Sequence, residues 1–312
     1  MTFKITILGT GSARPTTYRH HSAHALNVHE QFYLVDCGEG TQVRLLEVGI
    51  HPLKLNAAFI SHLHGDHVYG LFPLISSMGM MGRKTPFTIF APAPFGELMG
   101  CHFRYFDNRL PFEVLYKEVE TRQHALIFES KVMEVWSVPL RHRIPTTGYI
   151  FREKTPPLNI KKETIERYGL GIAQITAAKR GEDIFSDNGV LIAKNADITY
   201  TPYPPRSYAY CSDTQPSGKV ASLVKGVDLL YHEATFMENE KAMAKETGHS
   251  TALQAAKTAA TAEAGRLLIG HFSSRYKNAG PLVEEARTLF PETYAAVEKE
   301  TFQIDVVKER HG

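Results

Sequence analysis

A cluster of metal-binding side chains constrains the fold of this chain more than any other feature of its sequence. Four potential ligands fall within six residues, directly after the apolar segment 55–61: His62, His64, Asp66 and His67. In a loop the first two histidines can converge on one ion, while the last two ligands turn toward a second ion, with Gly65 allowing the reversal. Imidazole and carboxylate groups are common zinc ligands, and capping of a following helix is the weaker explanation. The cluster therefore predicts one end of a two-zinc hydrolytic site.

Three more candidate ligands each follow another apolar segment that predicts a strand: His142, Asp213 and His271. Proteins of the α/β class usually build their sites at the carboxyl ends of strands. A single histidine after a strand is more often a capped or solvated residue. The shared placement of all three favours one site that also includes the cluster.

Short β-rich segments and helical periodicities alternate along the chain. We expect strands over 3–8, 25–28, 32–36, 55–61, 88–91, 112–115, 132–138, 209–211, 229–232 and 267–270. We expect helices over 41–48, 68–78, 251–264 and 282–290. Mixed elements without a flexible linker predict one α/β domain made of two similar halves.

The segment from about 154 to 203 departs from this pattern because it is rich in Pro, Gly, Lys and Arg. Between 154 and 183 it holds six basic residues against four acidic ones. We interpret it as an insertion that projects from the core. A surface segment that has no function of its own is the alternative explanation.

Composition limits the cellular setting and the class of partner. No apolar run approaches the ~18 residues that cross a bilayer, and residues 1–8 lack a signal-peptide pattern. The three cysteines are scattered, which indicates a reducing compartment, so we expect a cytoplasmic protein without a membrane association. A formal net charge of +2 is compatible with binding nucleic acid but does not require it.

The chain resembles the ribonuclease Z family of the metallo-β-lactamase superfamily, which processes the 3′ end of tRNA. The resemblance rests on the histidine cluster and on five further motifs in the same order. These motifs are Leu-Gly-Thr-Gly at 8–11, Asp-Cys-Gly-Glu-Gly-Thr-Gln at 36–42, His-Glu-Ala-Thr-Phe at 232–236, His-Ser-Thr at 249–251 and Ser-Ser-Arg-Tyr at 273–276. The match runs from Ile7 to about Tyr276.

The resemblance implies a metallo-β-lactamase fold: a four-layer αβ/βα sandwich of two mixed sheets flanked by helices. It implies a single domain over 1–312 with the projecting arm at about 154–203. It also implies a metal-dependent endoribonuclease, a phosphodiesterase that removes the 3′ trailer of precursor tRNA by attack of an activated water and leaves a tRNA 3′-hydroxyl.

The same resemblance implies two Zn²⁺ ions per chain, with Mn²⁺ or another divalent metal as the alternative, and no small organic cofactor. One zinc would be held by His62, His64 and His142, and the other by Asp66, His67 and His271. Asp213 would bridge the two ions. Two nearby cations lower the pKa of a shared water and stabilise charge on the attacked phosphate.

Three residues are candidates for catalysis. Asp66 could orient or deprotonate the water, His249 could protonate the leaving ribose oxygen, and Glu233 could hold the His249 ring. From the residues alone, His249 equally fits a position before a helix that Ser250 or Thr251 caps. Without the family resemblance these two explanations are even.

Precursor tRNA is the expected partner, and the resemblance implies a homodimer in which the arm of one subunit serves the tRNA bound by the other. RNA contacts are expected from Arg19, Lys161, Lys162, Arg167 and Arg275. Two departures from the family pattern bear on these contacts. The Pro-x-Lys-x-Arg-Asn loop keeps only Pro15 and Arg19, and the arm lacks its usual Gly-Pro element at 169–174.

Three other functions remain open. A zinc phosphodiesterase for small or cyclic nucleotides would share the metal site, and the altered loop at 15–20 keeps this alternative in view. A thioester or β-lactam hydrolase is disfavoured by the motifs at 232–236 and 249–251. A non-catalytic RNA-binding protein is disfavoured by the complete set of ligands.

Overall fold

The computed structural model describes residues 1–106 and 109–307. The chain divides into two compact units, of which the first comprises Met1–Arg152 and Ser207–Ile304. The second comprises Glu153–Arg206 and the residues from Asp305 onward. The prediction of a single domain over 1–312 with an arm at about 154–203 stays a prediction, and its last residues, 308–312, lie outside the described residues.

Two seven-stranded mixed sheets form the first unit. The first sheet has the order β18-β1-β2-β3-β4-β5-β6, with strands β18 (Thr301–Gln303), β1 (Phe3–Gly9), β2 (Ala23–Val28), β3 (Gln31–Val35), β4 (Leu55–Phe59), β5 (Phe87–Ala91) and β6 (Val114–Glu118). The second has the order β17-β16-β15-β14-β9-β8-β7, with strands β17 (Thr293–Ala295), β16 (Arg266–Gly270), β15 (Leu229–Glu233), β14 (Ser207–Cys211), β9 (Thr147–Glu153), β8 (Met133–Pro139) and β7 (Leu126–Glu129).

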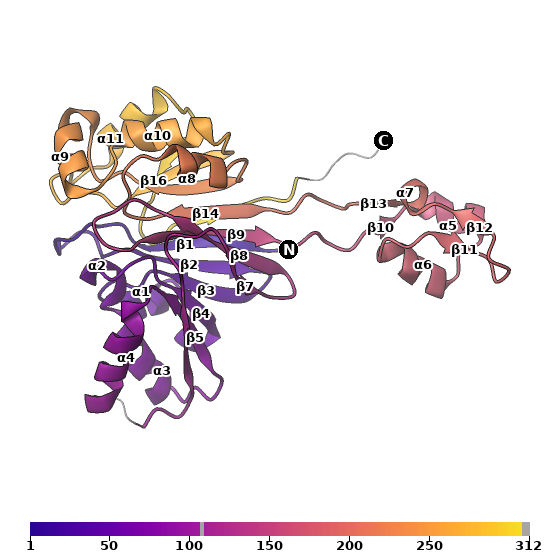
Figure 1. The fold of residues 1–312 in the computed structure, drawn as a ribbon, viewed down its shortest axis with the longest axis horizontal. Helices are drawn as coiled ribbons and strands as arrows, with labels where there is room; N and C mark the ends of the chain where they lie inside the picture. Colours follow the sequence, from indigo (N-terminus) through magenta and orange to yellow (C-terminus); the bar gives the residue numbers. More distant parts are fainter. Residues whose placement is uncertain (107–108, 308–312) are drawn as a thin grey trace. The chain divides into compact units, whose positions relative to one another are not determined.

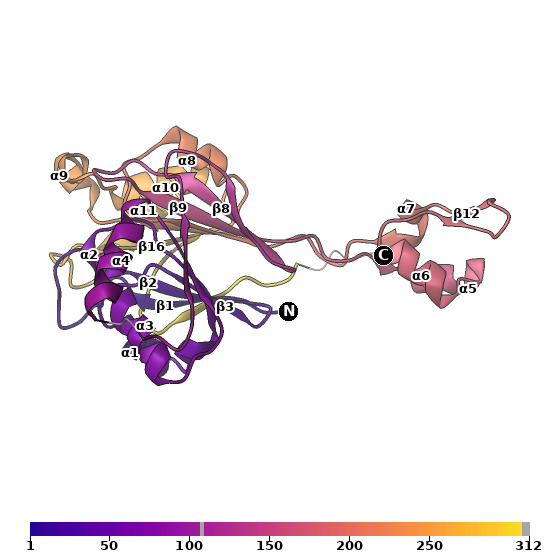
Figure 2. The same ribbon diagram turned by 60° about the horizontal axis from the view of Figure 1, so that its bottom comes forward.

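Helices cover the outer face of each sheet, which gives the four-layer sandwich that the family resemblance predicts (Figures 1 and 2). The first sheet is covered by α1 (Thr41–Glu47), α3 (Leu71–Met80) and α4 (Pro94–Tyr105). The second is covered by α8 (Gly218–Leu223), α10 (Ala252–Thr261) and α11 (Gly280–Arg287). The prediction of a metallo-β-lactamase fold is therefore confirmed.

Large aromatic side chains fill the space between the two sheets. Phe59 on β4 stacks on Phe90, with ring centroids 4.8 Å apart, and meets Phe151 of β9 edge to face at 5.2 Å. Tyr210 on β14 stacks on Tyr231 of β15 at 4.8 Å with nearly parallel rings. These interlocked rings fix the spacing of the sheets, and so the positions of the loops at their strand ends.

The second unit has its own small core. It contains α5 (Lys162–Tyr168), α6 (Ile172–Lys179) and α7 (Asn195–Ile198), and the strand pairs β10 (Asn159–Ile160) with β13 (Thr199–Tyr200) and β11 (Ile184–Phe185) with β12 (Leu191–Ala193). Buried apolar residues hold these elements together: Leu170, Ala178, Ile184, Ala193 and Ile198. No helix within the described part of the chain is long and apolar enough to span a membrane.

The predicted helix over 68–78 is wrong in its boundaries. The structure has two helices there, α2 (Gly65–Val68) and α3, separated by Tyr69 and Gly70. The Gly70 N–H donates to the carbonyl of Cys37, and a Cβ at this position would lie 1.9 Å from the carbonyl oxygen of Gly38. This close approach of two backbones needs glycine and interrupts the helix.

Candidate metal centre

The candidate ligands gather at one edge of the two sheets. Strands β3 and β4 are parallel, as are β14, β15 and β16, so their carboxyl ends lie at the same edge of each sheet. Asp213 follows β14 by two residues and His271 directly follows β16, while His62 comes three residues after β4. Short connections after strands therefore bring both halves of the molecule to one site.

The first group that could hold a metal ion consists of His62, His64, His142 and Asp213. His64 Nδ1 lies 3.0 Å from His62 Nε2 and 3.4 Å from His142 Nε2. Burial lowers the pKa of His62 to about 4 and also lowers the pKa values of His64 and His142. These imidazoles are therefore neutral at physiological pH and each keeps a lone pair for a cation.

The second group consists of Asp66, His67 and His271. His67 Nε2 lies 3.2 Å from His271 Nε2, and Asp66 Oδ2 lies 3.4 Å from each of these nitrogens. Asp66 Oδ2 also accepts a hydrogen bond from the Ala13 amide at 2.7 Å, which fixes the orientation of the carboxylate.

The carboxylate of Asp213 lies between the two groups. Its Oδ2 is 3.5 Å from His62 Nε2 and 3.8 Å from His142 Nε2, whereas its Oδ1 is 3.2 Å from His271 Nε2 and 3.4 Å from His67 Nε2. Each oxygen thus faces a different group. The side chain is almost fully buried, and its Oδ1 has no hydrogen-bond partner among the described residues.

The spacing of these donor atoms fits divalent metal ions. Ligands about 2.0–2.1 Å from a tetrahedral zinc lie about 3.3 Å from one another. The contacts given above run from 3.0 to 3.8 Å, and all donor atoms of a group lie within 4.8 Å of one another. A shared proton can satisfy two imidazole nitrogens at such a distance, but only a cation satisfies three or four donors that converge on one point. The buried, unpartnered Asp213 oxygen also requires positive charge. The donor set therefore fits the cations that the sequence predicts.

A buried carboxylate, that of Asp36, orients one imidazole of each group. Asp36 Oδ2 accepts hydrogen bonds from His67 Nδ1 at 2.7 Å and from the Ser61 hydroxyl at 2.8 Å. Because Ser61 donates to Asp36, its oxygen accepts from His62 Nδ1 at 2.9 Å. Both imidazoles are thereby fixed with Nε2 toward the site.

A third donor reaches Asp36 from the opposite sheet. The hydroxyl of Tyr210 on β14 donates to Asp36 Oδ2 at 2.7 Å. Asp36 itself has a positive φ of 54°, a conformation that costs energy and is kept here by this ring of donors. Sequence reasoning noted Asp36 only as part of a motif and missed Ser61 and Tyr210. A lone aspartate after an apolar strand was the available signal.

Glu233 has in the second half of the molecule the role that Asp36 has in the first. Its Oε1 accepts from His249 Nδ1 at 2.9 Å, and its Oε2 accepts from the hydroxyl of Thr235 at 2.7 Å. Thr235 in turn accepts from His271 Nδ1 at 3.0 Å, which leaves His271 Nε2 facing the other candidate ligands. One carboxylate therefore sets the orientation of both His249 and His271.

The ring of His249 carries a proton readily in this position. Burial opposes the charge, but the Glu233 carboxylate outweighs it and raises the pKa of His249 to about 9. The Thr251 side chain accepts from the backbone amide of Gln254 and caps α10. The helix-capping explanation is therefore also correct, and Thr251 is the capping residue. His249 itself faces the site and lines its pocket.

An open pocket of about 580 Å³ leads to the candidate ligands. Its walls include His64, Asp66, His142, His249 and His271, and the exposed side chains of Tyr69 and Arg143. The pocket is open to solvent, and its aromatic and guanidinium groups are of the kinds that contact bases and phosphates.

The predicted RNA-contacting residues lie in three different settings. Arg19 donates to the carbonyl groups of Tyr276 and Lys277, and Arg275 pairs with Glu240 at 3.3 Å, so both guanidinium groups have partners within the chain. Lys161 donates to the Asp197 carbonyl. Exposed side chains of the second unit complete the set: Lys162 and Arg167. The RNA contacts of all five stay predictions.

Comparison with known proteins places the chain beside ribonuclease Z over nearly its whole length. It is 42% identical over 297 residues to ribonuclease Z of Porphyromonas gingivalis, covering 95% of this chain and 97% of that protein. It is 43% identical over 291 residues to ribonuclease Z of Parabacteroides distasonis, covering 93% and 95%. A family model described as anti-Pycsar protein Apyc1 matches residues 3–99 only.

Two solved structures resemble the chain over nearly its whole length. The short form of human tRNase Z has a TM-score of 0.69 and 25% identity, covering 97% of this chain and 99% of that chain. The metallo-β-lactamase fold protein YhfI from Bacillus subtilis has a TM-score of 0.68 at 17% identity, covering 97% and 100%, and shares the fold.

The Tyr210 hydroxyl provides a test of how the site is held. We expect Tyr210→Phe to weaken zinc or manganese binding by about 10- to 100-fold, because Asp36 loses a donor that fixes its orientation toward His67. Titration of the metal-free protein against a competing chelator measures this affinity.

Tyr231→Phe is the matched control. Tyr231 stacks on Tyr210, and its hydroxyl has no hydrogen-bond partner among the described residues. The control should bind metal like the parent chain. Equal losses in the two variants would mean that aromatic packing, and not the hydrogen bond to Asp36, supports the site.

Proposed function

The chain belongs to the ribonuclease Z family, and from this premise we propose that it removes the 3′ trailer of precursor tRNA as a metal-dependent endoribonuclease. Two observations carry the proposal: the similarity to ribonuclease Z spans nearly the whole chain, and the chain itself brings together two groups of donors that meet at Asp213. The product would be a tRNA with a 3′-hydroxyl and a trailer with a 5′-phosphate.

The donor groups support two Zn²⁺ ions per chain, with Mn²⁺ as the alternative. His62, His64 and His142 would hold one ion and Asp66, His67 and His271 the other, with Asp213 between them. Bound divalent ions would supply charge that lowers the pKa of a water molecule and offsets the negative charge of the attacked phosphate.

The chain's own groups would handle the protons. Asp66, fixed by the Ala13 amide, would orient the attacking water and accept its proton. His249 would donate a proton to the ribose 3′-oxygen as the bond to phosphorus breaks. Glu233 would keep the ring in position throughout through its contact with His249 Nδ1, which leaves Nε2 to face the substrate.

The second unit would serve as an arm that grips tRNA outside the active site. Its support is a compact core of its own and the exposed basic side chains of Lys162 and Arg167. We also propose that the chain forms a homodimer, in which each arm serves the partner's tRNA, and that it acts in the cytoplasm.

Mapping the cleavage of one precursor tRNA tests the function directly. We expect a single cut at the 3′ side of the acceptor stem, a 3′-hydroxyl on the tRNA and a 5′-phosphate on the trailer. Chelation should abolish the reaction, and metal analysis of the purified protein should approach two zinc ions per chain. A chain that hydrolyses cyclic nucleotides or small diesters but leaves precursor tRNA uncut would contradict the proposal.

The role of His249 as an acid can be separated from a structural role. We expect His249→Ala to lower kcat on precursor tRNA by about 10²- to 10⁴-fold, because a ribose oxygen leaves poorly without a proton. Nitrophenolate needs no such help, so kcat on bis(4-nitrophenyl) phosphate should fall far less. Comparable losses on the two substrates would assign His249 to the metal site or to folding instead.

The arm is tested by changing its basic residues together. We expect Lys161→Ala/Lys162→Ala/Arg167→Ala to raise KM for precursor tRNA and to flatten the dependence of KM on salt. A variant that contacts fewer phosphates releases fewer counterions when it binds the tRNA. Steady-state kinetics between 50 and about 200 mM salt measure both effects.

A triple change of exposed lysines in the first unit is the matched control: Lys84→Ala/Lys117→Ala/Lys131→Ala. This control removes the same number of charges and should leave KM unchanged. If the arm variant loses as much activity on bis(4-nitrophenyl) phosphate as on precursor tRNA, the arm has no special part in RNA binding.

A further inference from the structure

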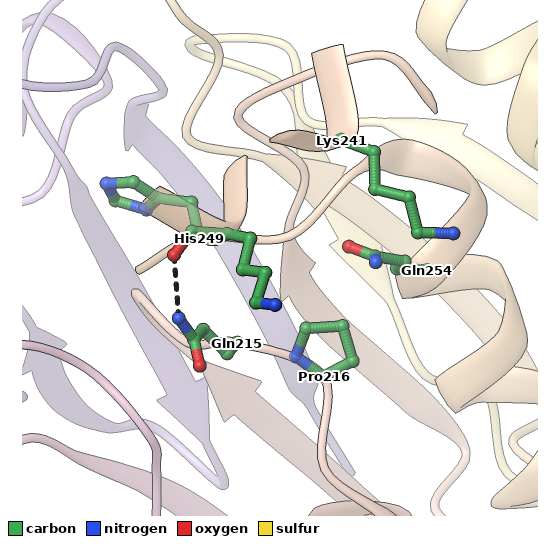
Figure 3. A pocket seen from close by; sticks show the side chains of 6 residues that line it. Gln215, Pro216, Lys241, His249 and Gln254 are labelled. Atoms are coloured by element: carbon green, nitrogen blue, oxygen red, sulfur yellow. Dashed lines mark hydrogen bonds between the residues drawn. The ribbon is translucent and has the colours of Figure 1, made fainter. Parts of the chain in front are cut away.

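A second pocket, of about 240 Å³, adjoins the metal centre (Figure 3). We call it the α9 pocket, after helix α9 (Lys241–Thr247), and it is lined by Gln215, Pro216, Lys241, Lys245, His249 and Gln254. His249 also lines the pocket above the metal centre. Its imidazole points away from Lys241 and Gln254 in Figure 3, and the residue borders both spaces.

The α9 pocket is fastened to the same loops that carry the metal-centre residues. The Gln215 side-chain amide donates to the Lys245 carbonyl at 2.8 Å, and His142 Nδ1 lies 2.8 Å from the Gly248 carbonyl oxygen. Gln215 follows Asp213 by two residues, a reach of at most about 7 Å. A group bound in this pocket would therefore lie next to the metal centre.

The charge of the α9 pocket suits an anion. None of the described residues that line it is acidic, and its charged residues other than His249 are both lysines. The ammonium group of Lys241 forms an ion pair with the Glu238 carboxylate at 2.6 Å, whereas the side chain of Lys245 is exposed at the pocket. Lys245 is therefore the stronger candidate for a phosphate contact.

The two amide side chains add polar groups of both kinds. Gln254 accepts from the Thr251 amide through Oε1, which leaves its NH₂ group as a donor. Gln215 donates through Nε2, which leaves its Oε1 as an acceptor. Donor and acceptor together can pair with the edge of a base, and the volume is below the roughly 300–1,000 Å³ of drug-sized sites. The pocket is open to solvent, so it can take the base edge and the phosphate of one nucleotide without enclosing the whole unit.

We propose that the α9 pocket binds the nucleotide on the tRNA side of the scissile phosphate. This inference rests on the proposed function. The leaving 3′-oxygen belongs to the tRNA, and His249, which would protonate it, is shared by both pockets. The nucleotide that bears this oxygen then lies beside His249, with its own 5′-phosphate on Lys245 and its base edge on Gln215 and Gln254.

The test compares Lys245→Ala with Lys257→Ala, an exposed lysine of α10 outside the pocket. For Lys245→Ala we expect a several-fold rise in KM for precursor tRNA, and a slope of log(kcat/KM) against log salt that is shallower by roughly 0.7, the value for one single-stranded phosphate contact. The loss on precursor tRNA should exceed that on bis(4-nitrophenyl) phosphate at least fivefold. Lys257→Ala should match the parent chain.

Product inhibition decides which strand the pocket takes. Lys245→Ala should weaken inhibition by mature tRNA that ends at the cleavage site, and should leave inhibition by a 5′-phosphorylated trailer oligonucleotide unchanged. The reverse pattern would overturn the assignment to the tRNA side, and no change with either product would overturn the pocket as an RNA site. A parent chain that does not cut precursor tRNA would remove the proposed function, and this inference with it.

Discussion

The carboxylate of Asp213 is the point on which the two halves of the molecule depend. It is almost fully buried, and imidazoles from both sheets face it: His62 and His67 from the first, His142 and His271 from the second. A buried carboxylate is costly unless it is matched by positive charge. The strand ends of both sheets must therefore arrive together, which links the packing of the sandwich to the assembly of its site.

Two further buried carboxylates, one in each half, orient the imidazole rings of the site. Asp36 holds His67 directly and His62 through the Ser61 hydroxyl, while Glu233 holds His249 directly and reaches His271 through Thr235. In both cases a buried anion, directly or through a hydroxyl group, fixes one nitrogen of each ring and turns the other nitrogen toward the candidate metal centre. The halves thus share an arrangement of hydrogen bonds as well as an arrangement of strands.

The sequence predicted the fold class and gathered the candidate ligands because each ligand follows an apolar strand, a local pattern. It could not place the break at Gly70, which exists because the backbone of Gly38 comes close in the folded chain. Tyr210 was missed because all five residues of β14 are buried, and a tyrosine there resembles ordinary core. Likewise, the direction of Arg19 is set by carbonyl groups more than 250 residues away.

The connection between β9 and β14 has a consequence for how such a protein can change over time. These strands are antiparallel neighbours, with Arg152 opposite Ser207, so the chain leaves and re-enters the sheet at adjacent positions. A tight hairpin would close the sheet equally well, and the entropy of closing a longer loop grows only with the logarithm of its length. A segment can therefore be inserted at this junction without disturbing the sheet. Inserts can be lengthened, exchanged or deleted there during evolution, while the hydrolytic centre is inherited intact.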